Sequence, residues 1–243
     1  MITRRDFLKL GITGLAGFGL SRDLLAQTSP ASINGLRWVF LVDTYKCVGC
    51  GLCVKACKLE NEVPYDANIT RTWVERYVQK KDGSVVADSP LGGRDGYLEN
   101  NPQGIIVPEA DIAKAFFVPK LCNQCEKPPC VQVCPVGATY QAKDGVVLVD
   151  RKWCIGCGYC IMACPYGVRF FHPASNTAEK CNFCYHRISN NMEPACVLAC
   201  PFGARRIGNL MDPEDPVAKI IKTERVGVLK EEFGTDPRCY YIG

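Results

Sequence analysis

The chain has 243 residues, with 29 Lys and Arg against 25 Asp and Glu, a formal net charge of +4, and 17 cysteines. A hydrophobic fraction of 47% and a charged fraction of 22% indicate a folded protein and exclude a disordered one. Because the basic residues form no long run, the sequence does not support a nucleic-acid partner. The number of cysteines is the feature that needs a chemical explanation.

The amino end reads TRRDFLK from Thr3 to Lys9, followed by the weakly apolar stretch GITGLAGFGL. Paired arginines followed by Phe, Leu and Lys resemble a twin-arginine signal peptide, and the alternative is an amphipathic helix. We expect residues 1–26 to be this signal, either cleaved after Ala26 or kept as an anchor. Export by the twin-arginine route and a periplasmic location follow as expectations. No later segment offers about 18 uninterrupted apolar residues, so an integral membrane protein is not expected.

Short strands that lead into cysteine loops are predicted along the rest of the chain. The apolar runs RWVFLVD and GVVLVD precede the first and third of four cysteine groups. Residues 138–150 predict a hairpin that turns at Lys143-Asp144-Gly145. Residues 202–210 are expected to pair with the strand at 38–42.

Two further segments are predicted to lie outside the cysteine loops. Residues 60–117 contain the strand-like TRTWVERYV and no cysteine, so this region predicts an insertion. Residues 216–232 have helical spacing. Since neither segment is needed to hold a metal, the insertion and the tail from 216 to 243 are candidate docking surfaces.

The four cysteine groups amount to an internal repeat. The groups are Cys47, Cys50, Cys53 and Cys57; Cys122, Cys125, Cys130 and Cys134; Cys154, Cys157, Cys160 and Cys164; and Cys181, Cys184, Cys196 and Cys200. A proline follows the last cysteine of every group except the first, in which Lys58 follows Cys57. Cys239 stands alone, and we expect it to be a buried apolar residue.

Three chemistries are compatible with such groups. Disulfides explain them poorly, because the C-x-x-C pairs would force tight local loops. Zinc held by two C-x-x-C pairs is an alternative, for which the fourth group could serve. The third group carries C-x2-C-x2-C-x3-C-P, the bacterial ferredoxin pattern, in which the fourth cysteine binds the neighbouring cluster. The full pattern with three variants of it favours iron-sulfur clusters over a zinc-bound interaction module.

The phrases CNQCEKPPCVQVCP, CIGCGYCIMACPYG and EKCNFCYHR resemble the four-cluster iron-sulfur (beta) subunit of the dimethyl sulfoxide reductase family of molybdoenzymes. Among its members, the sequence is most similar to the tetrathionate and polysulfide reductase subunits. The resemblance implies an α+β fold of two ferredoxin-like units, each carrying two [4Fe-4S] clusters. The outer unit would comprise 37–66 and 167–210 and the inner unit 118–166, with an insertion at 67–117 and a C-terminal extension at 211–243.

The resemblance also implies four ligand sets, in which the fourth cysteine of each group serves the opposite cluster. The outer sets would be Cys47, Cys50, Cys53 and Cys200, and Cys181, Cys184, Cys196 and Cys57. The inner sets would be Cys122, Cys125, Cys130 and Cys164, and Cys154, Cys157, Cys160 and Cys134. Nearby cations are expected either to offset cluster charge or to be solvated surface groups, namely Lys46, Lys55, Lys58, Lys180 and Arg187. His172 and His186 are expected to have structural roles.

The function that the resemblance implies is electron transfer, without catalysis by this chain. The chain contains no molybdopterin site, haem C-x-x-C-H motif or nucleotide-binding fingerprint, so catalysis is assigned to a partner. The expected partners are a molybdopterin-containing catalytic subunit and a multi-span membrane subunit that interacts with quinone. The alternative within redox chemistry is the iron-sulfur subunit of a periplasmic hydrogenase or formate dehydrogenase.

Overall fold

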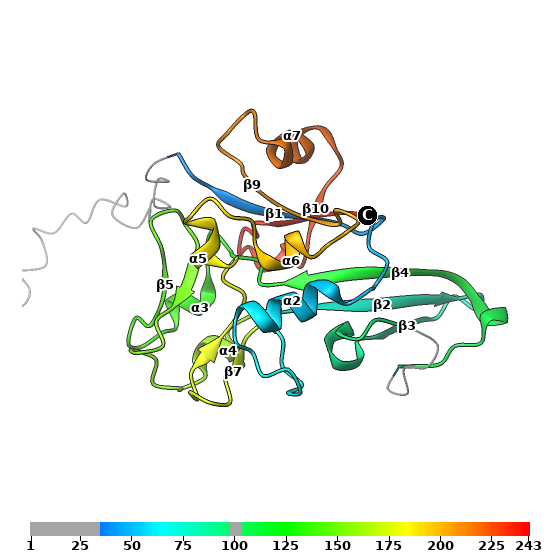
Figure 1. Cartoon of the computed structure of the whole chain (residues 1–243), viewed down its shortest axis with the longest axis horizontal. Helices are drawn as coiled ribbons and strands as arrows, with labels where there is room; N and C mark the ends of the chain where they lie inside the picture. Colours follow the sequence, from blue (N-terminus) through cyan, green and yellow to red (C-terminus); the bar gives the residue numbers. More distant parts are fainter. Residues whose placement is uncertain (1–34, 98–103) are drawn as a thin grey trace, which may run out of the picture. The chain divides into compact units, whose positions relative to one another are not determined.

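The structure is a computed structural model that describes residues 35–97 and 104–243. The predicted signal, residues 1–26, lies outside the described residues. Short helices and strands are joined by long loops (Figure 1). No helix within the described residues is long and apolar enough to cross a membrane.

A four-stranded sheet joins the two ends of the described chain. Its order is β10 (Gly227–Val228), β11 (Cys239–Ile242), β1 (Trp38–Asp43) and β9 (Arg205–Asn209). β1 pairs antiparallel with β9, from Trp38 opposite Asn209 to Val42 opposite Arg205, which confirms the predicted pairing. β1 also pairs in parallel with β11, a strand that was not predicted from the sequence.

β1 is buried on both faces, which explains its continuous apolar sequence. Phe40 and Val42 pack into the core that contains the cysteines. Val39 and Leu41 pack instead against α7 (Pro216–Thr223), which covers the other face of the sheet (Figure 1). The helix expected over 216–232 is therefore shorter than predicted, because the chain returns to the sheet as β10.

The predicted insertion forms a three-stranded antiparallel sheet. Its order is β3 (Val85–Asp88), β2 (Thr72–Lys80) and β4 (Ile112–Leu121), with 3-10 turns at Pro90–Gly93 and Glu109–Asp111. β2 confirms the strand predicted from TRTWVERYV. The segment after the turn at Pro90–Gly93 packs against the first cysteine loop, where a Cβ on Gly51 would lie 2.2 Å from the Arg94 carbonyl oxygen. Gly51 also has a φ of 75°, so only glycine suits this position.

The remaining elements are short and surround the cysteine loops. The predicted hairpin is confirmed as β5 (Thr139–Gln141) paired with β6 (Val147–Val149). A second small pair consists of β7 (Phe170–Phe171) and β8 (Ala178–Glu179). The helices are α2 (Leu52–Glu60), α3 (Pro129–Gln132), α4 (Tyr159–Met162), α5 (Tyr185–Ile188) and α6 (Ala195–Leu198), and a 3-10 turn spans Glu231–Phe233.

Candidate iron-sulfur sites

Helices α2 and α6 each direct two cysteines toward two different cavities. Cys53 and Cys57 lie one turn apart on α2, and Cys196 and Cys200 have the same spacing in and just after α6. The two helices contact each other (Figure 1). Cys53 and Cys200 line the first cavity, whereas Cys57 and Cys196 line the second.

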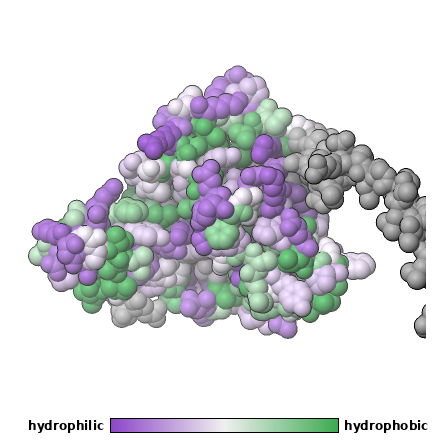
Figure 2. Space-filling model, turned by 180° about the vertical axis from the view of Figure 1, so that it is seen from behind, coloured by the Kyte–Doolittle hydropathy of each residue, from purple (hydrophilic) through white to green (hydrophobic). Residues whose placement is uncertain are grey.

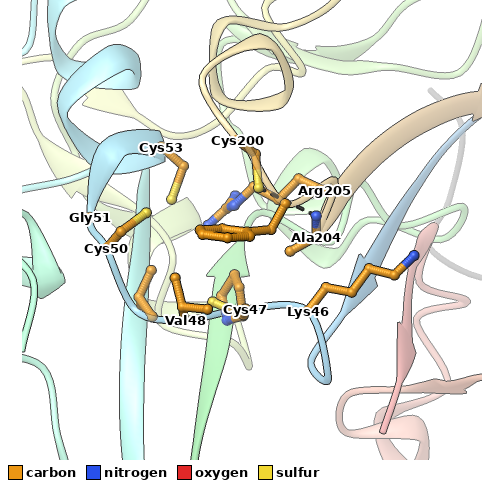
Figure 3. A pocket seen from close by; sticks show the side chains of 12 residues that line it. Lys46, Cys47, Val48, Cys50, Gly51, Cys53, Cys200, Ala204 and Arg205 are labelled. Atoms are coloured by element: carbon orange, nitrogen blue, oxygen red, sulfur yellow. Dashed lines mark hydrogen bonds between the residues drawn. The ribbon is translucent and has the colours of Figure 1, made fainter.

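The first cavity is lined by four thiols, those of Cys47, Cys50, Cys53 and Cys200. Figure 3 shows their sulfur atoms directed into the space between the first cysteine loop and the chain after α6. The backbone N–H of Ala204 donates to Cys200 Sγ over 3.3 Å. The remaining walls are mostly apolar, with Val74 and Pro119 from the three-stranded sheet.

The second cavity is lined by the thiols of Cys57, Cys181, Cys184 and Cys196. Burial raises the pKa of Cys57 well above its ordinary value, and the other three thiols of this set raise it further. Both outer cavities therefore bring together the four cysteines of one expected set, including the cysteine that is remote in sequence.

The inner cysteines are brought together by α3 and α4, which contact each other. Burial raises the pKa of Cys125 to about 12, and the nearby thiols of Cys122, Cys130 and Cys164, the rest of the expected third set, act in the same direction. Of the fourth set, Cys154 and Cys160 pack in one apolar cluster. Cys157 is exposed, and Cys134 Sγ accepts the N–H of Thr139 over 3.3 Å.

The donor set fits an iron-sulfur cluster. In each of the two outer sites four thiols surround a cavity, which is the number of ligands that a cubane cluster needs. Burial raises the pKa of Cys47 and of Cys181 to about 11. Such thiols become thiolates only where iron and nearby cations supply positive charge.

Two buried arginines supply that charge, and neither was predicted from the sequence. Arg205 is 1% exposed and lies beside Cys47, Cys53 and Cys196, and among the residues that the structure describes neither of its Nη atoms has a hydrogen-bond partner. Arg169 is 5% exposed and lies beside the thiols of Cys130 and Cys160. A buried cation without a counter-charge destabilises the folded chain. Arg205 and Arg169 therefore suit sites that receive an anionic cluster.

A sequence pattern could have identified these arginines. Each stands five residues after the last cysteine of its group, in CPYGVR and CPFGAR. The second group has Thr139 at the same position, and Arg169 Nη1 donates to its hydroxyl over 3.3 Å. The repeat therefore includes a polar side chain directed toward the cysteines as well as the cysteines themselves.

The cations proposed from the sequence have mixed positions. Lys180 is buried near Cys122 and Cys130, and its ammonium donates to the carbonyl oxygens of Val147 and Cys181. Lys58 is also buried, but its ammonium donates to the carbonyl oxygens of Pro64, Tyr65 and Ala67 and so holds a loop.

The other three cations form ion pairs at half-buried or exposed positions. They are Lys46 with Asp43 at 3.4 Å, Lys55 with Asp95 at 3.5 Å and Arg187 with Glu60 at 3.0 Å. Both histidines contact protein groups. His186 Nε2 lies 2.7 Å from Glu60 Oε1, and His172 Nε2 lies 3.4 Å from the Glu62 carbonyl oxygen.

Two family models match the chain, both described as a 4Fe-4S dicluster domain, over residues 46–138 and 113–210. A tetrathionate reductase subunit of Salmonella typhimurium is 40% identical over 99% of this chain and 88% of its own length. A selenate reductase subunit of Mesobacillus selenatarsenatis is 35% identical, over 86% and 73%. A putative dimethyl sulfoxide reductase iron-sulfur subunit of Halobacterium salinarum is 38% identical, over 83% and 77%.

Two dicluster domains and four cysteine groups correspond to four [4Fe-4S] clusters, which favours iron over the zinc alternative. The relatives are subunits of reductases, and a cluster of this kind exchanges single electrons. The chain therefore belongs to the four-cluster iron-sulfur subunits of the dimethyl sulfoxide reductase family, as an electron-transfer subunit and not a catalytic one.

Proposed function

We propose that this chain relays electrons between a molybdopterin-containing catalytic subunit and a membrane subunit that interacts with quinone. The sixteen grouped cysteines would hold four clusters in the two outer and two inner ligand sets. The named relatives are subunits of reductases, so a reductase is proposed ahead of a hydrogenase or formate dehydrogenase.

The observation that carries this proposal is the continuity between cysteine sets. Helices α2 and α6 both contribute to the first two sets. Cys181 of the second set and Cys122 of the third are electrostatic neighbours. The contacting helices α3 and α4 carry cysteines of the third and fourth sets. Sets that adjoin in this order support a path for electrons from one end of the series to the other.

Two exposed cysteines support docking of partner chains at both ends of the series of cysteine sets. Of the sixteen grouped cysteines, Cys50 of the first set and Cys157 of the fourth are exposed. Large apolar side chains are exposed in these two loops and the helices that follow them, namely Tyr45, Val48 and Leu52 at one site and Trp153, Ile155, Tyr159 and Met162 at the other. Apolar groups around an exposed ligand suit contact with a partner chain that must approach a cluster closely.

The insertion and the tail differ as candidate docking surfaces. On the face of the molecule seen in Figure 2, hydrophobic surface occurs on the part formed by the three-stranded sheet. Val85 and Ile106 of the insertion are exposed. The tail instead contributes β11, an interior strand whose Cys239 is fully buried, as expected of that cysteine. The proposal therefore places docking on the two exposed cysteine loops and the insertion.

The proposed function is tested with the isolated, cluster-loaded chain and a reduced dye. We expect the chain to take up about four electrons, one for each cluster, and to turn over no sulfur oxyanion. Turnover should begin when the catalytic subunit is added, with that subunit alone as the control. Reduction of substrate by the isolated chain would refute the relay.

We further propose export to the periplasm by the twin-arginine route, with the clusters already assembled. Changing Arg4 and Arg5 together to lysine is expected to leave cluster-loaded protein in the cytoplasm. Cell fractionation measures the outcome, and Arg22→Lys is a matched control outside the pair. The chain is produced without partners, because a partner with its own signal could carry it. Unchanged periplasmic delivery would count against the route.

A further inference from the structure

Asn61 follows α2, and its side-chain amide is directed toward two sulfurs of the second cavity. Asn61 Nδ2 lies 3.5 Å from Cys57 Sγ and 3.8 Å from Cys184 Sγ. The same nitrogen donates to the Cys57 carbonyl oxygen over 2.9 Å. The side chain is buried, so water does not compete for these contacts.

Arg71 fixes which end of this amide faces the sulfurs. Its Nη1 donates to Asn61 Oδ1 over 2.8 Å, and its Nη2 donates to Glu179 Oε2 over 2.6 Å. Arg71 and Glu179 are both buried. A guanidinium can only donate, so the amide oxygen must face Arg71 and the NH₂ group must face the sulfurs.

The other three cysteine groups have no amide at the position that corresponds to Asn61. Asn61 stands four residues after Cys57, the last cysteine of its group. The corresponding positions after Cys134, Cys164 and Cys200 hold apolar residues, namely Ala138, Val168 and Ala204. Any effect of this amide is therefore confined to the cluster that Cys57 serves.

We propose that Asn61 raises the reduction potential of the cluster in the second cavity and that Arg71 is its positioning residue. This inference rests on the proposed ligand set of Cys57, Cys181, Cys184 and Cys196. Reduction adds negative charge that is shared with the ligand sulfurs, and an N–H donor stabilises that charge. The donor stabilises the reduced cluster more than the oxidised cluster, so the reduction potential rises.

The test is a redox titration, followed by electron paramagnetic resonance, of the full, cluster-loaded chain. Asn61→Leu is expected to shift one of the four midpoint potentials to a more negative value and leave the other three unchanged. Arg71→Met should shift the same midpoint in the same direction, because it removes both the positive charge beside Cys57 and the contact that orients the Asn61 amide. Arg71→Lys keeps the charge and loses the guanidinium contact, so it should give the smaller shift expected of the orientation alone.

Arg151→Met is the matched control for Arg71. Arg151 Nε pairs with the other carboxylate oxygen of Glu179, at 2.5 Å, and does not hold Asn61. This variant should leave all four midpoints unchanged. An equal shift with Arg151→Met would attribute the effect to Glu179 or to general loosening and would overturn the role of Arg71.

Asn61→Asp provides a second variant of the same size. It keeps an oxygen for Arg71 and replaces the donor with an acceptor, so a larger negative shift is expected. An unchanged midpoint in both Asn61 variants would overturn the inference. Failure of both to retain this cluster would overturn it as well, because the amide would then serve cluster binding.

A failure of the proposed ligand set gives a different result from a failure of the inference about Asn61. The signal that belongs to the second cavity is identified by its loss in Cys57→Ser. If the unaltered chain shows no such signal, the proposed ligand set fails. If that signal is present and its midpoint does not respond to Asn61, only the inference fails.

Discussion

Cys57→Ser is expected to disrupt the cluster in the second cavity and to preserve the cluster in the first. Cys57 is close in sequence to Cys47, Cys50 and Cys53, yet its thiol lines the cavity of Cys181, Cys184 and Cys196. A serine hydroxyl is a much weaker iron ligand than a thiolate. The variant should therefore lose up to roughly a quarter of its iron and acid-labile sulfide, together with one of four paramagnetic signals.

Cys53→Ser is the matched partner of this variant, since Cys53 lies one turn earlier on α2 and lines the first cavity. It should remove the other outer signal. Cys239→Ser is the control for a buried cysteine outside the four groups, and it should retain all four clusters. Loss of the first-cavity signal in Cys57→Ser would show that ligands are not exchanged between groups.

Arg205→Met is expected to lower the midpoint potentials of both outer clusters. Burial acts to lower the pKa of Arg205, but Cys53, Cys196 and Cys47 outweigh it and raise the pKa, so the cation is retained. Removing a unit charge at about 4–8 Å, at an effective dielectric constant of about 20, changes the energy of an added electron by about 2–4 kcal/mol. This corresponds to roughly 90–180 mV toward more negative potential.

The same change should also destabilise the loaded protein. Removing one partner of a buried charge pair costs about 3–5 kcal/mol, because the remaining charge is uncompensated. Thermal unfolding of the loaded chain measures this loss, and a redox titration measures the potentials. Arg206→Met is the control, since Arg206 is only half-buried and its Nε donates to the Gly203 carbonyl oxygen over 3.2 Å. Equal effects of Arg205→Met and Arg206→Met would contradict the assigned position of Arg205. Equal shifts in the midpoint potentials of all four clusters would contradict it as well.

Local patterns were sufficient where neighbouring residues decide the structure. The hairpin at 139–149 follows from a turn with Asp144 and Gly145 between apolar residues. The run WVFLV predicts a strand, and the pairing of β1 with β9 was predicted with it. Sixteen cysteines at ligand spacing indicate the cofactor, because loop length limits which irons one segment can reach.

Long-range packing decided the features that sequence reasoning missed. β11 pairs with β1 across most of the chain, and its sequence CYYI carries no information about that partner. The helix predicted to extend to residue 232 ends at Thr223, because the chain must return to the same sheet. The sequence makes Lys58 a candidate counter-charge for a cluster, but three nearby carbonyl oxygens hold its ammonium.

The sequence by itself determined the number and chemical class of the ligand groups, because spacing along a covalent chain limits what a loop can bind. The tertiary structure decided which thiols share a cavity, since the contact between α2 and α6 directs Cys53 and Cys57 toward different remote cysteines. It also decided which charges surround those thiols. Arg205 and the pair of Asn61 and Arg71 acquire their roles from burial between segments that are distant in sequence, and burial is a property of the folded chain alone.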